Sequence, residues 1–153
     1  MSNALPLVRA LADPASTETL RPDEWTAILS IARAERLIGS LAVRLAERDL
    51  PVPIAEALEN ARVQTAFDHV QARWEVEMAR RLLAPLGITP ILLKGSAFVI
   101  GRLSASAGRA VGDLDILVPI DQLNRAEAAL LVGGYEWGKD DPYTQAYYRR
   151  WMH

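Results

Sequence analysis

Hydrophobic residues recur every three or four positions through the first half of the chain, a spacing that predicts a series of amphipathic helices. A short helix is expected over residues 5–12, and a second helix is expected to begin near Pro22. The second helix carries its apolar residues at helical spacing, and these are Trp25, Ile28, Leu29 and Ala32. We expect Gly39 and Ser40 to interrupt the pattern before a further helical segment at 41–49.

The longest predicted helix covers residues 54–84 and is bounded by proline at both ends. Pro51 and Pro53 indicate its start, while Pro85 and Gly87 indicate its end. Its apolar positions follow one another at steps of three or four residues, with one longer step, which predicts a single apolar face. These positions are Ile54, Leu58, Val63, Phe67, Val70, Trp74, Met78 and Leu82. We expect Trp74 and Met78 to belong to the core.

The period changes after this helix, and short strand-like segments alternate with shorter helices. The first expected elements are a strand at 91–93, a helix at 96–102 and a strand at 113–118. A helix follows, with Asp121 as its N-cap and Gly133 and Gly134 at its end. A short strand at 135–137 and a helix at 143–153 complete the order. The predicted class is therefore α/β (α+β), with a helical N-terminal part at 1–86 packed on a small mixed-sheet α/β unit at 87–153. The last helix ends abruptly, so we expect this unit to be truncated at its C-terminal end.

Composition narrows the classes of function. The chain has 153 residues, 50% of them hydrophobic, so one folded domain with a hydrophobic core is expected. Its net charge is −2 with both signs well mixed, which argues against a basic surface that binds nucleic acid. It has no cysteine, and His69 and His153 are its only histidines, which argues against disulfides and a zinc site. No apolar run approaches the roughly 20 residues that span a bilayer. The N-terminus does not resemble a signal peptide, so a cytoplasmic protein without a membrane partner is expected.

Two acidic residues at the start of one predicted strand, Asp113 and Asp115, are the first candidates for chemistry. Alternate residues of a strand point to the same face, so both carboxylates are expected on one side, opposite Leu114. Two neighbouring carboxylates repel each other and are costly to desolvate. A hard divalent cation such as Mg²⁺ would relieve that repulsion, whereas a solvated strand end would carry the same triplet without a metal.

A second candidate lies upstream, where Gly95 and Ser96 follow the predicted strand at 91–93. We expect a tight turn here, with Ser96 near the N-cap of the following helix. The N-terminus of a helix offers free backbone N–H groups to a phosphate, and Gly95 would let the backbone approach it closely. An ordinary strand-to-helix turn is the alternative. The glycine spacing is that of neither a Walker loop nor a dinucleotide fingerprint.

Two basic residues flank these candidates in the sequence. Lys94 precedes the turn, and Arg109 follows a loop of small residues at 104–108. Either cation could balance the charge of a triphosphate. Arg109 could equally form a salt bridge to Asp113 or Asp115, and Lys94 could simply be solvated.

Together, Leu93-Lys94-Gly95-Ser96 and Asp113-Leu114-Asp115-Ile116 resemble the signature of the nucleotidyltransferase superfamily that includes DNA polymerase beta. The chain more closely resembles a family of uncharacterised bacterial nucleotidyltransferases, whose pattern also includes an Arg before the acids, here Arg109, and a later Gly-Tyr, here Gly134-Tyr135. The resemblance covers about residues 88–138. Two features depart from the superfamily pattern: the spacer at 97–112 is longer, and no third carboxylate is evident, Glu136 being only a weak substitute.

The resemblance implies a nucleotidyltransferase-like α/β unit and a metal-dependent enzyme that moves a nucleoside monophosphate from an NTP such as ATP to an unidentified acceptor hydroxyl. In that case Asp113 and Asp115 would be catalytic and would hold two Mg²⁺ ions. The nucleotide would be bound by Lys94, Gly95, Ser96 and Arg109. The absent third carboxylate keeps open a catalytically silent nucleotide-binding or regulatory module, as in some toxin–antitoxin pairs. A helical interaction protein that works through residues 54–84 is a third possibility, and nothing in the sequence points to one oligomeric state.

Overall fold

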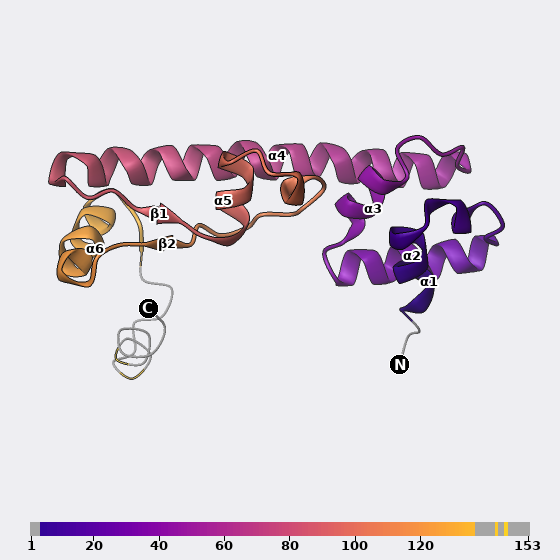
Figure 1. The fold of residues 1–153 in the computed structure, drawn as a ribbon, viewed down its shortest axis with the longest axis horizontal. Helices are drawn as coiled ribbons and strands as arrows, with labels where there is room; N and C mark the ends of the chain where they lie inside the picture. The colour runs from indigo at the N-terminus through magenta and orange to yellow at the C-terminus, as the bar shows by residue number, and fades with distance from the viewer. Residues whose placement is uncertain (1–3, 137–142, 144–145, 147–153) are drawn as a thin grey trace.

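Helix α4 (Val52–Leu83) organises the part of the molecule that the computed structural model describes, which is residues 4–136, 143 and 146. The other elements lie along one side of α4 (Figure 1). Its N-terminal half is accompanied by α1 (Leu5–Ala12), η1 (Pro14–Thr17), α2 (Pro22–Ala34) and α3 (Ile38–Arg44). Its C-terminal half is accompanied by η2 (Ala84–Leu86), β1 (Ile91–Leu92), α5 (Lys94–Ile100), η3 (Ser104–Ser106), β2 (Ile116–Leu117), η4 (Ile120–Gln122) and α6 (Leu123–Val132). The predicted α+β class is confirmed, since helices predominate and β1 and β2 form a small antiparallel sheet.

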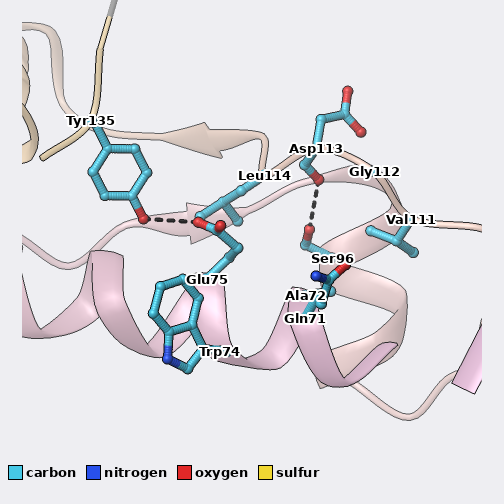
Figure 2. Close-up of a pocket in the computed structure, with 10 residues that line it drawn as sticks. All are labelled: Gln71, Ala72, Trp74, Glu75, Ser96, Val111, Gly112, Asp113, Leu114 and Tyr135. Carbon is cyan, nitrogen blue, oxygen red and sulfur yellow. Dashed lines mark hydrogen bonds between the residues drawn. The ribbon is translucent and has the colours of Figure 1, made fainter. Parts of the chain in front are cut away.

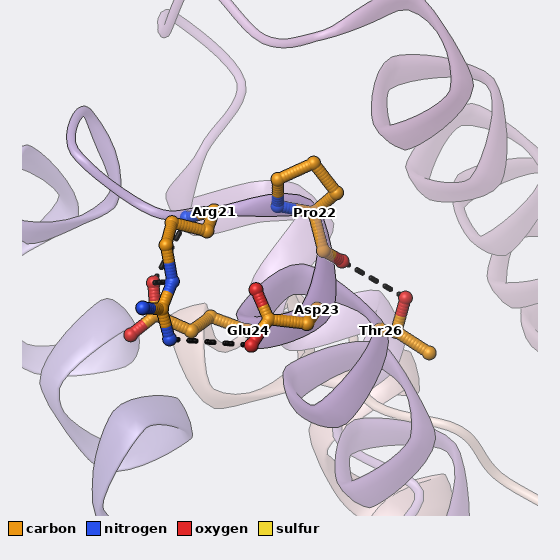
Figure 3. Close-up of polar contacts among 5 residues, drawn as sticks. All are labelled: Arg21, Pro22, Asp23, Glu24 and Thr26. Atoms are coloured by element: carbon orange, nitrogen blue, oxygen red, sulfur yellow. Dashed lines mark hydrogen bonds and ion pairs between the residues drawn. The ribbon is translucent and has the colours of Figure 1, made fainter.

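Helix α2 begins at Pro22, as the sequence predicts, and its first turn is stabilised by polar contacts. The backbone N–H of Arg21 donates to the Glu24 carboxylate at 2.9 Å (Figure 3). An acidic group in the first turn also lies near the positive end of the helix dipole. The four apolar residues expected to face the core, Trp25, Ile28, Leu29 and Ala32, are all buried.

The break between α2 and α3 lies earlier in the chain than predicted. It occurs around Arg36, which has a positive φ of 57°. Gly39 and Ser40 were expected to form the break but lie inside α3. Packing explains the glycine, because a Cβ at position 39 would collide with the carbonyl of Gly108 and would crowd the hydroxyl of Thr65.

Helix α4 has nearly the predicted limits, but the predicted apolar face is not the face that packs on the core. Among the eight predicted positions, all of which the structure describes, Leu58 alone is buried. Trp74, expected in the core, is 60% exposed. The buried positions of α4 are Leu58, Ala61, Thr65, Ala72, Ala79 and Leu83. The four small residues among them let neighbouring elements approach α4 closely, while Val63, Phe67, Val70 and Trp74 remain exposed.

Two hydrophobic clusters lie along α4. The first joins α1, α2 and α3 to the first half of α4, where Leu58 and Ala61 are buried. The second joins the end of α4 to the sheet and α6 through Leu83, Ile88 and Ala126. Helix α4 contributes to both clusters, and the predicted division between residues 86 and 87 stays a prediction.

The second half of the chain follows the predicted order of elements with shorter strands. The sheet pairs Ile91 with Leu117 and Leu92 with Ile116, so β2 begins after the acidic residues and not at them. The 3-10 turn η4 contains Asp121, and Gln122 is the N-cap of α6, which corrects the predicted cap.

The end of α6 at Gly133 and Gly134 agrees with the prediction. Tyr135 and Glu136 are not in a strand, and Trp137 and most of the predicted helix at 143–153 lie outside the described residues. Within the described part of the chain, no helix combines the length and the apolar character needed to cross a membrane.

Candidate functional site

The glycine turn and the acidic segment, which are far apart in the sequence, lie side by side in the structure. Beyond the last strand pair, the backbone N–H of Leu93 donates to the carbonyl of Asp115 at 3.0 Å. This contact extends the antiparallel pairing by one residue. Because the chain turns into α5 immediately afterwards, residues 94–96 are held against residues 113–115.

Lys94 connects the two segments through its side chain. Its ammonium group lies 3.0 Å from Oδ1 of Asp115, with the Lys94 side chain 68% exposed and the Asp115 side chain 30% exposed. The ion pair supplies a positive charge to one of the two acids, which lowers the repulsion between them. An exposed pair of this kind contributes only about 0–1 kcal/mol, so Lys94 can exchange Asp115 for another anion at little cost.

The backbone of Lys94 is also unusual. Its φ is +49°, in the left-handed region that non-glycine residues rarely adopt. The local cost of that conformation is about 1–2 kcal/mol. The contacts of the neighbouring residues therefore hold the turn between β1 and α5 in one particular shape.

Ser96 has a different place from the one predicted. Helix α5 already begins at Lys94 with Leu93 as its N-cap, so Ser96 lies in the first turn and not at the cap. Its side chain is buried, and its hydroxyl donates to the carbonyl of Asp113 at 3.1 Å. The hydroxyl thus positions the backbone of the acidic segment.

Gly95 packs closely against the same segment. A Cβ at this position would lie 3.2 Å and 3.3 Å from the two methyl carbons of Val111. The side of Gly95 where a side chain would stand is therefore filled by protein. Close packing between α5 and the acidic segment accounts for this glycine in the structure.

Asp113 and Asp115 precede β2, and their side chains differ in environment. Asp113 is exposed, and its carboxylate points away from Trp74, Glu75 and Tyr135 (Figure 2). Among residues 4–136, 143 and 146, no group of three or more His, Cys, Asp or Glu side chains is arranged to hold a metal ion. Glu136 therefore does not complete a three-ligand cluster with the two aspartates.

Arg109 does not pair with either aspartate within the described residues. Its guanidinium carbon lies 5.4 Å from the centre of the Phe98 ring, a cation–π contact with α5. Its carbonyl oxygen lies 2.9 Å from Nε2 of His69 on α4. The salt bridge that the sequence left open is therefore absent, and Arg109 instead joins the loop at 104–112 to α4 and α5.

A further cation near the acids, Arg36, could not be found from sequence spacing. A Cβ built on Gly112 would lie 3.0 Å from Nη2 of Arg36, so this guanidinium is next to the residue that precedes Asp113. Arg36 comes from the connection between α2 and α3. Only the tertiary packing of that connection on the loop brings the charge here.

A cavity of about 430 Å³ lies behind the acidic segment, between that segment and α4. It is lined by Gln71, Ala72, Trp74, Glu75, Ser96, Val111, Gly112, Asp113, Leu114 and Tyr135 (Figure 2). The phenol of Tyr135 donates to Oε2 of Glu75 at 3.0 Å. Burial first, and then this hydrogen bond to Glu75, raises the pKa of Tyr135 to about 12. Sequence reasoning missed the part of α4 in this wall, since Trp74 had been placed in the core.

Comparison with known proteins adds one finding. The model of a family described as "Uncharacterised nucleotidyltransferase" matches residues 21–153. The matched region contains α2 to α6, both aspartates and the glycine turn. No curated protein and no solved structure matches the chain.

Proposed function

The chain belongs to the family of uncharacterised nucleotidyltransferases, enzymes of the transferase kind, and on that premise we propose that it moves a nucleoside monophosphate from an NTP to an acceptor hydroxyl. The observation that carries the proposal is the contact between the two halves of the sequence signature. The N–H of Leu93 bonds to Asp115, and the hydroxyl of Ser96 bonds to Asp113. A turn with cationic character and two acids thus meet at one end of the β1–β2 pair.

The donor set suits Mg²⁺ bound together with a substrate. Mg²⁺ is usually held by one or two carboxylates plus substrate phosphates, and Asp113 and Asp115 supply two carboxylates within three residues. We assign both aspartates to metal binding, with two ions expected when a nucleotide is present. When bound, such ions neutralise phosphate charge and activate the acceptor hydroxyl.

The protein's own cations would act on the phosphates. Lys94 bonds to Asp115 in the structure, and a bound triphosphate would draw its exposed ammonium towards the phosphate oxygens. Arg36 beside Gly112 adds a second positive group from the helical part. Arg109, whose guanidinium lies over the Phe98 ring, is a third positive group on the loop at 104–112 that could contact the phosphates.

Ser96 and Gly95 would serve the nucleotide indirectly. The buried Ser96 hydroxyl fixes the backbone of Asp113, and Gly95 allows α5 to pack on Val111. We therefore give the two residues the task of positioning the carboxylates, with only backbone groups of the turn left for phosphate contact. The cavity behind them has aromatic walls from Trp74 and Tyr135, which could receive the planar part of a substrate.

A nucleotide-binding module without turnover is the second candidate. It is favoured by one observation, the lack of a three-carboxylate cluster among the described residues. It requires the same turn and the same cations but no transfer to an acceptor. Binding and pyrophosphate release therefore distinguish the two functions.

The first test measures thermal stability with each of the four NTPs, with and without Mg²⁺. A ligand at about 100 times its dissociation constant stabilises a fold by about 2.7 kcal/mol. We expect a rise in melting temperature that needs both nucleotide and metal and that Asp115→Asn abolishes. Asp121→Asn removes an exposed acid from η4 and should keep the full response.

The second test measures pyrophosphate release from the nucleotide that binds. Release that Asp113→Asn and Asp115→Asn both abolish is expected for the transferase. Binding without release, over a broad set of acceptor hydroxyls, would favour the silent module. If Asp115→Asn binds nucleotide and metal as well as the wild type does, the assignment of the site is wrong.

A further inference from the structure

The outer face of α4 carries a row of four large apolar side chains, Val63, Phe67, Val70 and Trp74, which we call the α4 stripe. Each is at least 55% exposed. Residues three or four apart on a helix lie on the same side, so the four form one continuous row. The buried residues of α4, such as Ala72, lie on the opposite side of the helix, roughly 180° away at 3.6 residues per turn.

Such a row is unusual on a free surface. Continuous exposed apolar patches commonly mark contact sites, and α4 is apolar on two opposite faces. The other described elements lie along one side of α4, which leaves the opposite side open to a partner (Figure 1). The stripe therefore needs an occupant that the inner packing of the described chain does not provide.

The spacing of the stripe is symmetric under reversal. Its steps are four, three and four residues, the same from either end. Two copies of α4 packed antiparallel, with the two-fold axis between Asp68 and His69, would set Val63 against the partner's Trp74 and Phe67 against the partner's Val70. A two-fold interface requires this self-complementarity, because each contact occurs twice.

The charges beyond both ends of the stripe follow the same symmetry. Glu56 lies seven residues before Val63, and Arg81 lies seven residues after Trp74, so both continue the line of the stripe. Both residues are exposed, and Arg81 also pairs with Glu77 at 2.7 Å within its own helix. Antiparallel packing sets each Glu56 opposite the partner subunit's Arg81. Parallel packing in register would instead set Glu56 against the same acid of the partner.

We propose that the α4 stripe is the interface of a homodimer in which two α4 helices pack antiparallel. The contact extends from Glu56 to Arg81, about 38 Å of helix at 1.5 Å per residue. Four large residues from each copy form a smaller core than a standard interface of about 1,600 Å² contains, so the dimer dissociates on dilution. The dimer does not rest on the nucleotidyltransferase proposal, since no site aspartate takes part, although Trp74 also lines the cavity behind the acidic segment.

Sedimentation velocity over a range of protein concentrations tests the dimer. The expected result is a species of twice the 16.9 kDa chain mass that dissociates on dilution. Phe67→Glu should raise the dissociation constant more than about tenfold, because it puts a charge at the centre of the interface. Val132→Glu introduces the same charge at an 89% exposed position on α6 and should leave the dimer intact. Unchanged circular dichroism in both variants shows that they fold.

Disulfide trapping tests the direction of the helices, and the chain suits it because it has no cysteine of its own. A mixture of Val63→Cys and Trp74→Cys proteins should form a disulfide between chains, while either variant alone should not. In the antiparallel pair, identical positions of either variant are about 16 Å apart along the helix, beyond the reach of a disulfide. Trapping of Val63→Cys with itself, or a monomeric wild type at every concentration, would overturn the proposal, whatever else then covers the stripe.

Discussion

Lys94 and Asp115 show at the residue scale how the site satisfies its charges. The two neighbouring aspartates in the sequence suggested a bound metal cation. In the structure, the ammonium group of Lys94 places a positive charge beside Asp115. The pair is exposed, so its net stabilisation is small and its partners can change. In the function that we propose, an anionic ligand would compete for Lys94 and a metal ion would take its place at Asp115.

Tyr135 provides a prediction at the same scale. Its pKa is raised from 10.0 to about 12, so the folded protein favours the neutral phenol. The stabilisation by this phenol is fully present below about pH 10 and is lost as the pH rises from 10 to 12. Tyr135→Phe removes the hydrogen bond to Glu75, and we expect it to lower the free energy of unfolding at neutral pH by about 1 kcal/mol.

The measurement is chemical denaturation of both proteins from neutral pH to pH 12. The free energy of unfolding of the wild type minus that of Tyr135→Phe should fall steadily between pH 10 and 12, because only the wild type carries this phenol; groups that both proteins share cancel in the difference. Ultraviolet absorbance of tyrosinate gives an independent reading of the pKa. A difference that stays constant up to pH 12 would show that the phenol of Tyr135 is not held neutral by the fold.

Packing between elements depends on two glycines at the contact of α3 with the loop after η3. Gly108 has a φ of +70°, and a Cβ there would collide with the carbonyl of Gly39. We expect Gly108→Ala to lower the free energy of unfolding by about 3 kcal/mol, because backbone strain and overpacking add.

Gly87→Ala is the matched control, since its φ is +72° and no atom lies within 4 Å of the added Cβ. This variant should lower the free energy of unfolding only through backbone strain, by about 1–2 kcal/mol. Denaturant titration measures both values. Equal losses in the two variants would mean that the contact between α3 and the loop is loose in solution.

At the scale of the whole molecule, α4 joins two hydrophobic clusters in one continuous helix. Leu83 is fully buried in the second cluster, and Leu83→Ala should destabilise the protein by about 2–5 kcal/mol. Because α4 also holds the first cluster, we expect the amides of α2 to lose protection from hydrogen exchange in this variant.

Val132→Ala removes methyl groups from an 89% exposed residue and serves as the control. It should leave exchange in α2 unchanged. If Leu83→Ala exposes only α6 and the sheet while α2 keeps its protection, the two clusters unfold separately and α4 does not couple them.

The sequence by itself determined the class of fold, the approximate limits of the long helix and the buried face of α2. It also determined that the glycine turn precedes the acidic segment along the chain. These features follow from local chemistry. Proline and glycine fix where helices begin and end, and hydrophobic spacing of 3.6 residues fixes the face of a helix when one face alone is apolar. The family signature could be found for the same reason, since its residues are close together within each half.

Only the tertiary structure decided which face of α4 is buried, which partner Lys94 takes and which cation lies beside Gly112. Helix α4 is apolar on two faces, so periodicity favoured the larger side chains, while close approach of neighbouring elements selected the small ones. Arg36 reaches the acidic segment through packing between residues far apart in the chain, and Ser96 is buried because the antiparallel pairing brings Asp113 over it. Contacts of this kind depend on distances in space, which spacing along the chain does not encode.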